Sequence, residues 1–327
     1  MTIKNKALIA VVIFVVLLGV VFLLHENPYK ANDDVKLPVI PEVDVKTIDK
    51  VELVNKSDSL IFEKRGEDWW ITGSKEYQAD KSFFSLVVEK LGKIELERLV
   101  SENKEKHAQF EVDQEGTRLK AFSKGQEVRS LIVGKNTPDY RGTFLRLKED
   151  DKVYASKQIV SGALKRKLSD WRDKALWETV PTEQFASVSV TLGTSEFTLT
   201  HTPSTPAEGD KPAVAEKWSV KGDDKFSVDK ARANGLTQTL SGMRWSDVVD
   251  EPASLAEYGL DKPSAVVSFS KTDGSGHKVL IGNVDEEKKI AWIAVDNDPK
   301  VYQIKKYQHE KLVNNKDFYK GNSEEAK

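Results

Sequence analysis

Hydrophobic residues are concentrated in one unbroken run near the start of the chain. Residues 7–24 read ALIAVVIFVVLLGVVFLL and contain no polar side chain. As a helix, these 18 residues are about 27 Å long, close to the roughly 30 Å hydrocarbon thickness of a bilayer. A buried core helix would show a polar face at helical spacing, and this run has none. We therefore predict a transmembrane helix at 7–24.

The residues that flank the run predict its orientation and fate. Lys4 and Lys6 precede it without an acidic residue, so residues 1–6 are expected in the cytoplasm and the C-terminal bulk outside. The alternative is a cleaved signal peptide, whose apolar region is usually about 7–15 residues and ends at a small-x-small site. This run is longer and continues into charged residues, which favours an uncleaved anchor in the inner (cytoplasmic) membrane, with the lipid bilayer contacted through 7–24. Residues 25–42 are polar and contain proline, and are expected to form a tether to periplasmic or extracytoplasmic domains.

The rest of the chain repeats itself. Residues 110–154 align with residues 258–302 at a constant offset of 148, without a gap. We predict two copies of one domain, residues 43–177 and 178–320, followed by a polar tail at 321–327. Further matched positions are 131–134 with 279–282, Leu164 with Leu312, Trp171 with Tyr319 and Trp70 with Trp218.

The same order of elements is expected in each copy. Apolar residues at every second position open it and predict half-buried antiparallel strands. Asp80 and Asp229 precede apolar residues at helical spacing, so each is expected to cap a helix. Each copy is expected to end in a helix, at 159–176 and 306–318, and residues 201–216 are an insertion expected to form a surface loop of the second copy. The fold class is α+β: two tandem copies of a mostly antiparallel sheet with covering helices, preceded by one transmembrane helix. The strands expected in the first copy run through Ile48, Val51 and Leu53, Leu60 and Phe62, Trp70, 118–122, 130–133, 143–147 and 152–154.

Composition excludes several classes of partner and site. Fifty basic and fifty-two acidic residues are interspersed and give a net charge of -2, so no nucleic-acid surface is expected. The chain has no cysteine, which excludes disulfides, thiolate metal sites and a cysteine nucleophile.

Candidate chemistry is sparse. Histidines occur singly, without the spacing of a metal site, and surface histidine is the prevailing interpretation. Carboxylates at 149–151 and 285–287 offer acid/base or calcium chemistry, but they lie between predicted strands, where solvated turns are expected. We predict no enzyme activity, no catalytic residue, no cofactor and no metal. The histidines are His25, His107, His201, His277 and His309.

Two surface features are candidate interfaces. Trp69 neighbours Trp70 on a predicted strand and must point to the opposite face, either as an exposed contact residue or as packing between sheet and helix. The loop at 138–141 occurs in the first copy only and presents Tyr140 and Arg141, either for contact or as an ordinary turn.

The segment at 168–174 carries a family resemblance. It reads LSDWRDK, and with the anchor and the duplicated domain it resembles a bacterial family of unknown function with an N-terminal membrane helix and tandem repeats. The resemblance implies an accessory role, because such proteins are typically encoded beside an ABC-type permease, its ATPase and a gliding-motility-like auxiliary protein. It implies no active-site residues. The second copy has NKDFYK at 315–320 instead, so an interface role of Arg172 is not expected in both copies.

These observations lead to a ranked expectation of function. We predict a membrane-anchored, non-enzymatic extracytoplasmic subunit of an ABC-type transporter or envelope complex, whose partner is a permease or its auxiliary subunit. The alternative is an anchored binding module for an envelope glycan or exported ligand, with a cleft lined by aromatic residues such as Trp69. The third is an envelope hydrolase.

Overall fold

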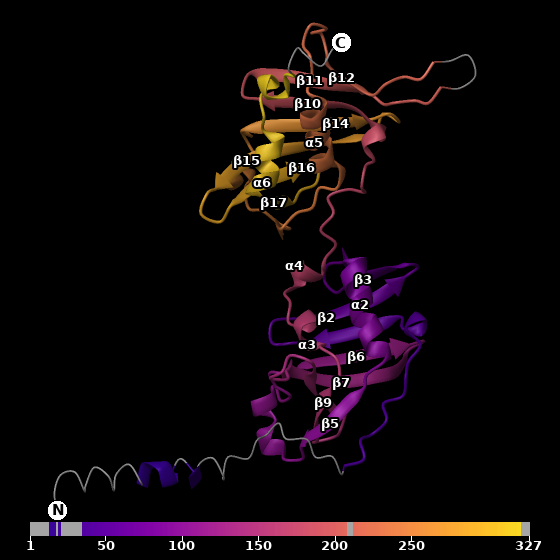
Figure 1. Cartoon of the computed structure of the whole chain (residues 1–327), viewed down its shortest axis with the longest axis vertical. Helices are drawn as coiled ribbons and strands as arrows, with labels where there is room; N and C mark the ends of the chain where they lie inside the picture. The colour runs from indigo at the N-terminus through magenta and orange to yellow at the C-terminus, as the bar shows by residue number, and fades with distance from the viewer. Residues whose placement is uncertain (1–12, 18, 21–34, 208–211, 322–327) are drawn as a thin grey trace, which may run out of the picture. The chain divides into compact units, whose positions relative to one another are not determined.

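The chain folds into two compact units in the computed structural model (Figure 1). The structure describes residues 13–17, 19–20, 35–207 and 212–321. Unit 1 ends at Asp173 and unit 2 begins at Lys174. Trp177, which the sequence assigned to the first copy, packs in the core of unit 2.

Unit 1 is built on a nine-stranded antiparallel sheet in the order β4-β3-β2-β1-β6-β7-β8-β9-β5. Its alternating sequence places apolar side chains on one face, as in β1, where Val51 and Leu53 are buried. The strands are β1 (Lys50–Val54), β2 (Ser59–Arg65), β3 (Asp68–Thr72), β4 (Tyr77–Gln78), β5 (Leu96–Ser101), β6 (Thr117–Ser123), β7 (Gln126–Asn136), β8 (Thr143–Leu147) and β9 (Val153–Ser156).

Unit 2 repeats this topology with eight strands in the order β12-β11-β10-β14-β15-β16-β17-β13, again all antiparallel. Each strand has a counterpart in unit 1, and β4 is the additional strand of the first copy. The tandem duplication and the antiparallel α+β fold are therefore confirmed. The strands are β10 (Phe185–Leu192), β11 (Ser195–Thr202), β12 (Lys217–Val220), β13 (Asp247–Val249), β14 (Ala265–Lys271), β15 (Gly276–Asp285), β16 (Ile290–Val295) and β17 (Val301–Lys305).

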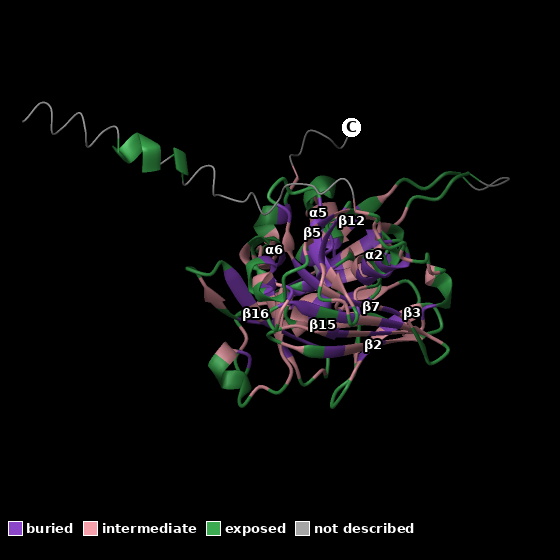
Figure 2. Ribbon diagram, turned by 90° about the horizontal axis from the view of Figure 1, so that it is seen from below, coloured by how far each residue is buried: buried purple, intermediate pink, exposed green. Residues whose placement is uncertain are grey.

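One twelve-residue helix packs on each sheet, α2 (Lys81–Gly92) in unit 1 and α5 (Lys230–Ser241) in unit 2. The predicted caps are confirmed: Asp80 accepts a hydrogen bond from Phe83 N at 3.0 Å, and Asp229 accepts one from Arg232 N at 3.1 Å. In Figure 2 the buried residues, in purple, gather where these helices meet their strands.

The end of each copy differs from the expected single helix. In unit 1 the chain forms two short helices, α3 (Ser161–Leu164) and α4 (Leu168–Trp171). Three cationic residues, 165–167, separate them, and none of the three is buried. The prediction of a helix through 159–176 is wrong, because Arg172 is extended and forms a bridge with Ala79. Unit 2 ends in α6 (Lys306–Leu312) and a 3-10 turn, η6 (Lys316–Tyr319). The other 3-10 turns are η1 (Val45–Thr47), η2 (Lys104–Lys106), η3 (Ala108–Phe110), η4 (Thr182–Gln184) and η5 (Leu255–Tyr258).

The tryptophan register of the repeat needs a correction. Trp69 is the buried tryptophan of β3 and Trp218 is the buried tryptophan of β12, whereas Trp70 is only half-buried. Trp69 therefore corresponds to Trp218, at the same offset as the helix caps, and the earlier pairing of Trp70 with Trp218 was one residue out of step.

The insertion of the second copy is the connection between β11 and β12. Thr205 and Val214 pair across it, and residues 204–207 and 212–215 are exposed, as predicted for a surface loop.

Most of the predicted transmembrane segment, residues 7–24, lies outside the described residues, as do residues 1–6, 25–34 and 322–327. Residues 13–17 and 19–20 are helical, and their apolar side chains are exposed. Within the described part of the chain, no helix reaches the length and hydrophobicity needed to cross a membrane.

Candidate functional site

The segment that leads into unit 1, residues 35–45, lies against the folded domain. Val35, Leu37, Ile40 and Val43 pack on its core, and Val43 N donates to Gly92 O at 2.9 Å. The sequence predicted a tether through residue 42, so part of that tether is held by unit 1. We call residues 35–45 the leading segment.

Arg129 holds the leading segment against the end of α2. Its side chain is 6% exposed and donates to Leu91 O at 3.0 Å, Gly92 O at 3.1 Å and Pro41 O at 2.8 Å. Carbonyl oxygens at a helix C-terminus carry partial negative charge, which suits a guanidinium. Burial lowers the pKa of Arg129 from its ordinary value. The side chain therefore joins its own strand, β7, to the end of α2 and to the leading segment. We call Arg129 and these three bonds the clamp.

Unit 2 holds its own leading residues in the same way with different chemistry. Val180 N donates to Ser241 O at 2.9 Å, as Val43 N does to Gly92 O, and the Trp177 indole donates to Leu240 O at 2.8 Å. His277 occupies the position of Arg129 and stacks on Trp177, with ring centroids 4.8 Å apart. An indole thus supplies in unit 2 the helix-end donor that a guanidinium supplies in unit 1.

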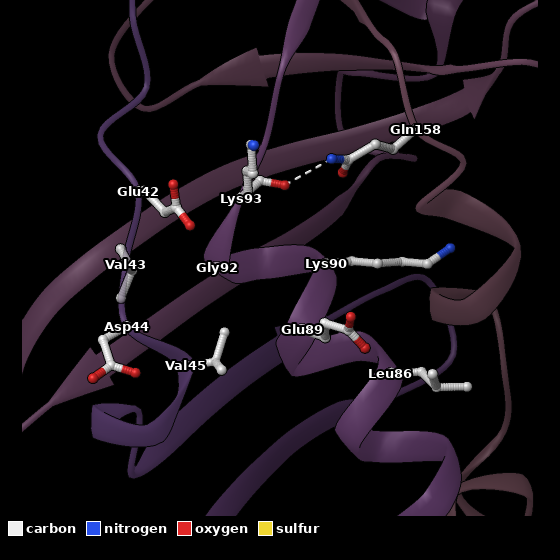
Figure 3. A pocket seen from close by; sticks show the side chains of 10 residues that line it. All are labelled: Glu42, Val43, Asp44, Val45, Leu86, Glu89, Lys90, Gly92, Lys93 and Gln158. Atoms are coloured by element: carbon white, nitrogen blue, oxygen red, sulfur yellow. Dashed lines mark hydrogen bonds between the residues drawn. The ribbon is translucent and has the colours of Figure 1, made fainter.

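A cavity of about 540 Å³ lies beside the clamp in unit 1 (Figure 3). Gly92 lies close to the leading segment, because a Cβ there would lie 2.3 Å from Val45 Cγ1. Lys90 donates to Ile159 O at 2.6 Å, and Gln158 donates to Lys93 O at 2.8 Å, the bond dashed in Figure 3. Charges of both signs line it. The lining residues are Glu42, Val43, Asp44, Val45, Leu86, Glu89, Lys90, Gly92, Lys93 and Gln158.

Among the described residues of unit 1, the most exposed aromatic side chain lies in the loop between β7 and β8. Tyr140 is 73% exposed and has a left-handed backbone with φ of 56°. Such a conformation is unfavourable for a bulky residue and persists only where surrounding structure fixes it. Arg141 follows it and is exposed too.

Hydrogen bonds fix this loop from within. Thr137 N donates to Gly142 O at 2.9 Å, Gly142 N donates to the Thr137 hydroxyl at 2.9 Å, and Tyr140 N donates to Thr137 O at 2.9 Å. The Thr137 hydroxyl also donates to Asp139 at 2.5 Å, and that bond, with the Arg141 backbone N–H, lowers the pKa of the Asp139 carboxyl. Tyr140 and Arg141 are therefore displayed on a rigid support. We call residues 137–142 the display loop.

The other two predicted interface residues are not exposed. Trp69 is 5% exposed and packs edge-on against Phe84 of α2, with centroids 4.9 Å apart, so the packing alternative holds and the contact alternative is wrong. Arg172 is 7% exposed, and its guanidinium lies 3.8 Å from the centroid of the Tyr77 ring. Neither offers an open surface to a partner.

Two histidines depart from the expected surface position. His107 is 5% exposed, with Nε2 2.6 Å from Asp151 O, and His201 is 9% exposed and stacks on Trp218. No group of three metal-binding side chains occurs among the residues the structure describes.

Carboxylates between strands have structural partners. Asp150 accepts from the Tyr154 hydroxyl at 2.8 Å and from Lys152 N at 2.9 Å, and Asp298 accepts from Tyr302 at 2.7 Å in the equivalent turn. Desolvation raises the pKa of Tyr154, aided by its bond to Asp150.

The fold defines a protein of two tandem antiparallel α+β repeats, each holding its leading residues at the end of one helix. The chain belongs to the family described as "Domain of unknown function (DUF4340)", whose profile matches residues 69–214 and again residues 218–322. No curated protein and no solved structure matches the chain.

The two family matches begin at Trp69 and Trp218, the pair that the structure makes equivalent. The first match extends to residue 214 and so includes β10 and β11, the opening strands of unit 2. The family's repeat therefore starts at the buried tryptophan, two strands later than the folded unit.

Proposed function

We propose that this protein is a membrane-anchored, non-enzymatic extracytoplasmic subunit that docks on an ABC-type permease or its auxiliary protein. In this proposal residues 7–24 span the cytoplasmic membrane with the N-terminus inside. The exposed apolar side chains at residues 13–17 and 20 support an anchoring role, because such a surface in water is unfavourable.

A short connection supports a partner in the same membrane. Ten residues, 25–34, separate the proposed span from Val35, where the leading segment meets unit 1. Even fully extended, they reach about 35 Å. This restriction raises the effective concentration of unit 1 toward membrane proteins beside the anchor.

The observation that carries the docking proposal is the display loop. A strained, rigid loop that holds Tyr140 73% exposed costs stability without burying its aromatic ring. Tyrosine and arginine are favoured at the centres of protein interfaces, and a preorganised loop loses little entropy on binding. In unit 2 the corresponding connection is a tight turn at residues 286–289, which lacks an exposed aromatic residue.

Site-specific photocrosslinking in native membranes tests this proposal. A photoreactive residue in place of Tyr140 should give a crosslinked species that contains a permease or auxiliary subunit. The matched control places the same residue at Lys288, in the corresponding turn of unit 2, and should give little of that species. Equal crosslinking from both positions, or none to a membrane protein from position 140, would exclude the display loop as the docking surface.

A further inference from the structure

A second cavity of about 410 Å³ in unit 1 is rich in cationic side chains. It lies where the β1–β2 turn, the residues after η3 and the segment between α3 and α4 meet. Four cations and two carboxylates line it, together with Asn55, Ser57 and Thr117. The charged lining residues are Lys56, Glu111, Glu115, Lys165, Arg166 and Lys167. We call this cavity the basic pocket.

The fold itself does not require these charges, as unit 2 demonstrates. At the equivalent positions unit 2 has Gly193, Gly259, Pro263, Val313, Asn314 and Asn315, none of them charged. The two units share strand order, helix caps and the bonds to the cap amides, Asp80 N to Trp171 O and Asp229 N to Tyr319 O, each 2.8 Å. Six charges concentrated at one cavity of one copy therefore serve something other than folding.

The ion pairs inside the basic pocket do not account for the charges either. Lys165 pairs with Glu111, and Lys56 pairs with Glu115 at 2.8 Å. All four side chains are more than a third exposed, and exposed pairs of this kind contribute little to stability. A third lining cation, Arg166, has no carboxylate partner among the described residues.

Glu111 is held in an unfavourable backbone conformation. Its φ is 56°, and the equivalent residue of unit 2 is Gly259, with φ of 67°. Glycine adopts this conformation without strain, whereas glutamate does not. Unit 1 thus carries a carboxylate beside Lys165 at a position where glycine would fold more easily, as is typical of a binding site.

The Arg166 guanidinium is held over an aromatic ring. Its guanidinium lies 3.8 Å from the centroid of the Phe83 ring, and Phe83 in turn packs on the fully buried Trp171. Stacking covers the face of the guanidinium and leaves its N–H donors at the edge, the arrangement with which arginine binds phosphate oxygens.

We propose that the basic pocket binds the phosphate group of a small phosphorylated ligand. Arg166 and Lys165 contact the phosphate oxygens, while Glu111 positions Lys165. A phosphate monoester, whose charge near neutral pH is close to -2, suits a pocket lined by four cations and two carboxylates. The phosphate can belong to a monoester lipid headgroup, that of phosphatidic acid, or to a soluble molecule, because both present the same terminal oxygens.

Calorimetric titration of the full chain in nanodiscs of phosphatidylcholine, with glycerol phosphate as the probe, tests this assignment. We expect saturable binding that weakens at least about tenfold in the double variant Lys165→Gln, Arg166→Gln, since two charge-assisted contacts are lost. The control, Lys104→Gln with Lys148→Gln, removes the same charge from exposed sites of unit 1 and should leave the affinity unchanged. Both variants should melt with the wild type, because the removed pairs are exposed.

A second arm of the experiment identifies the source of the phosphate. In nanodiscs that contain phosphatidic acid, the headgroup should compete with glycerol phosphate and weaken its apparent affinity for the wild type if the basic pocket binds lipid. If the basic pocket binds a soluble phosphate, that affinity should not change. Either result supports the basic pocket. Absence of saturable binding, or equal weakening by the control variant, would overturn it.

Discussion

Replacing Arg129 with methionine should release the leading segment while unit 1 stays folded. The side chain is 6% exposed, and its three donated bonds reach Leu91, Gly92 and Pro41. Methionine fills a similar volume and accepts burial, so the change removes the donors without opening a large cavity.

The expected loss follows from the three bonds and the burial of the charge. Charge-assisted bonds contribute about 1.5–3 kcal/mol each, so the gross loss is about 6 kcal/mol. Removing the guanidinium also relieves a desolvation penalty of several kcal/mol, because none of the described residues pairs a carboxylate with Arg129. We expect the free energy needed to detach the leading segment from unit 1 to fall by about 2–3 kcal/mol.

Hydrogen exchange measured residue by residue is the assay. The Val43 amide, which donates to Gly92 O at 2.9 Å, should lose about 30- to 150-fold of its protection, the equivalent of the predicted energy. Arg118→Met is the matched control, because Arg118 is exposed on β6 and its replacement should leave Val43 protected. Unchanged exchange at Val43 in the Arg129 variant, or the same acceleration in the control, would refute the clamp.

Three further predictions concern stability. Gly282→Ala should destabilise unit 2 by about 1–3 kcal/mol in urea unfolding, since its Cβ would lie 2.0 Å from Tyr258 O, whereas Gly235→Ala, in open space on α5, should stabilise it by about 0.5–1 kcal/mol. Glu111→Gly should raise the unfolding free energy of unit 1 by about 0.5–1 kcal/mol, because glycine relieves a φ of 56°; a loss of stability would show that the backbone there is not strained. Burial lowers the pKa of His309 below its ordinary 6.5, so the neutral ring is favoured in the fold and unit 2 should lose stability as pH falls through 6.5. Unit 1 has serine at the equivalent position, so His309→Ser is the matched variant. It should reduce the dependence of the unfolding free energy on pH, measured by denaturation at several pH values. An unaltered dependence would assign the effect to other groups.

Local signals predicted much of the fold. Asp80 and Asp229 were recognisable as caps because the requirement is local: an oxygen acceptor three residues before an unsatisfied amide. The duplication was recognisable because buried positions repeat with constant spacing, as Leu164 and Leu312 do, both fully buried.

Positions decided by distant parts of the chain were not predictable. Trp69 and Trp70 both satisfy an alternating pattern, and only the location of α2 determines that Trp69 is the buried one. The edge strands β5 and β13 were not among the predicted strands, because their pairing with β9 and β17 depends on residues more than fifty positions away. Arg129 carried no sequence signal, since its three acceptors are backbone carbonyls.

The clamp has a mechanical consequence. A pull on the chain from the N-terminal side reaches the leading segment before it reaches β1, which lies in the sheet interior between β2 and β6. The contacts of Pro41 and Val43 would break one after another, as in peeling, whereas β1 is held by two neighbouring strands whose bonds must break together. Under a pulling force, the leading segment would therefore detach and extend while the sheet of unit 1 stays folded.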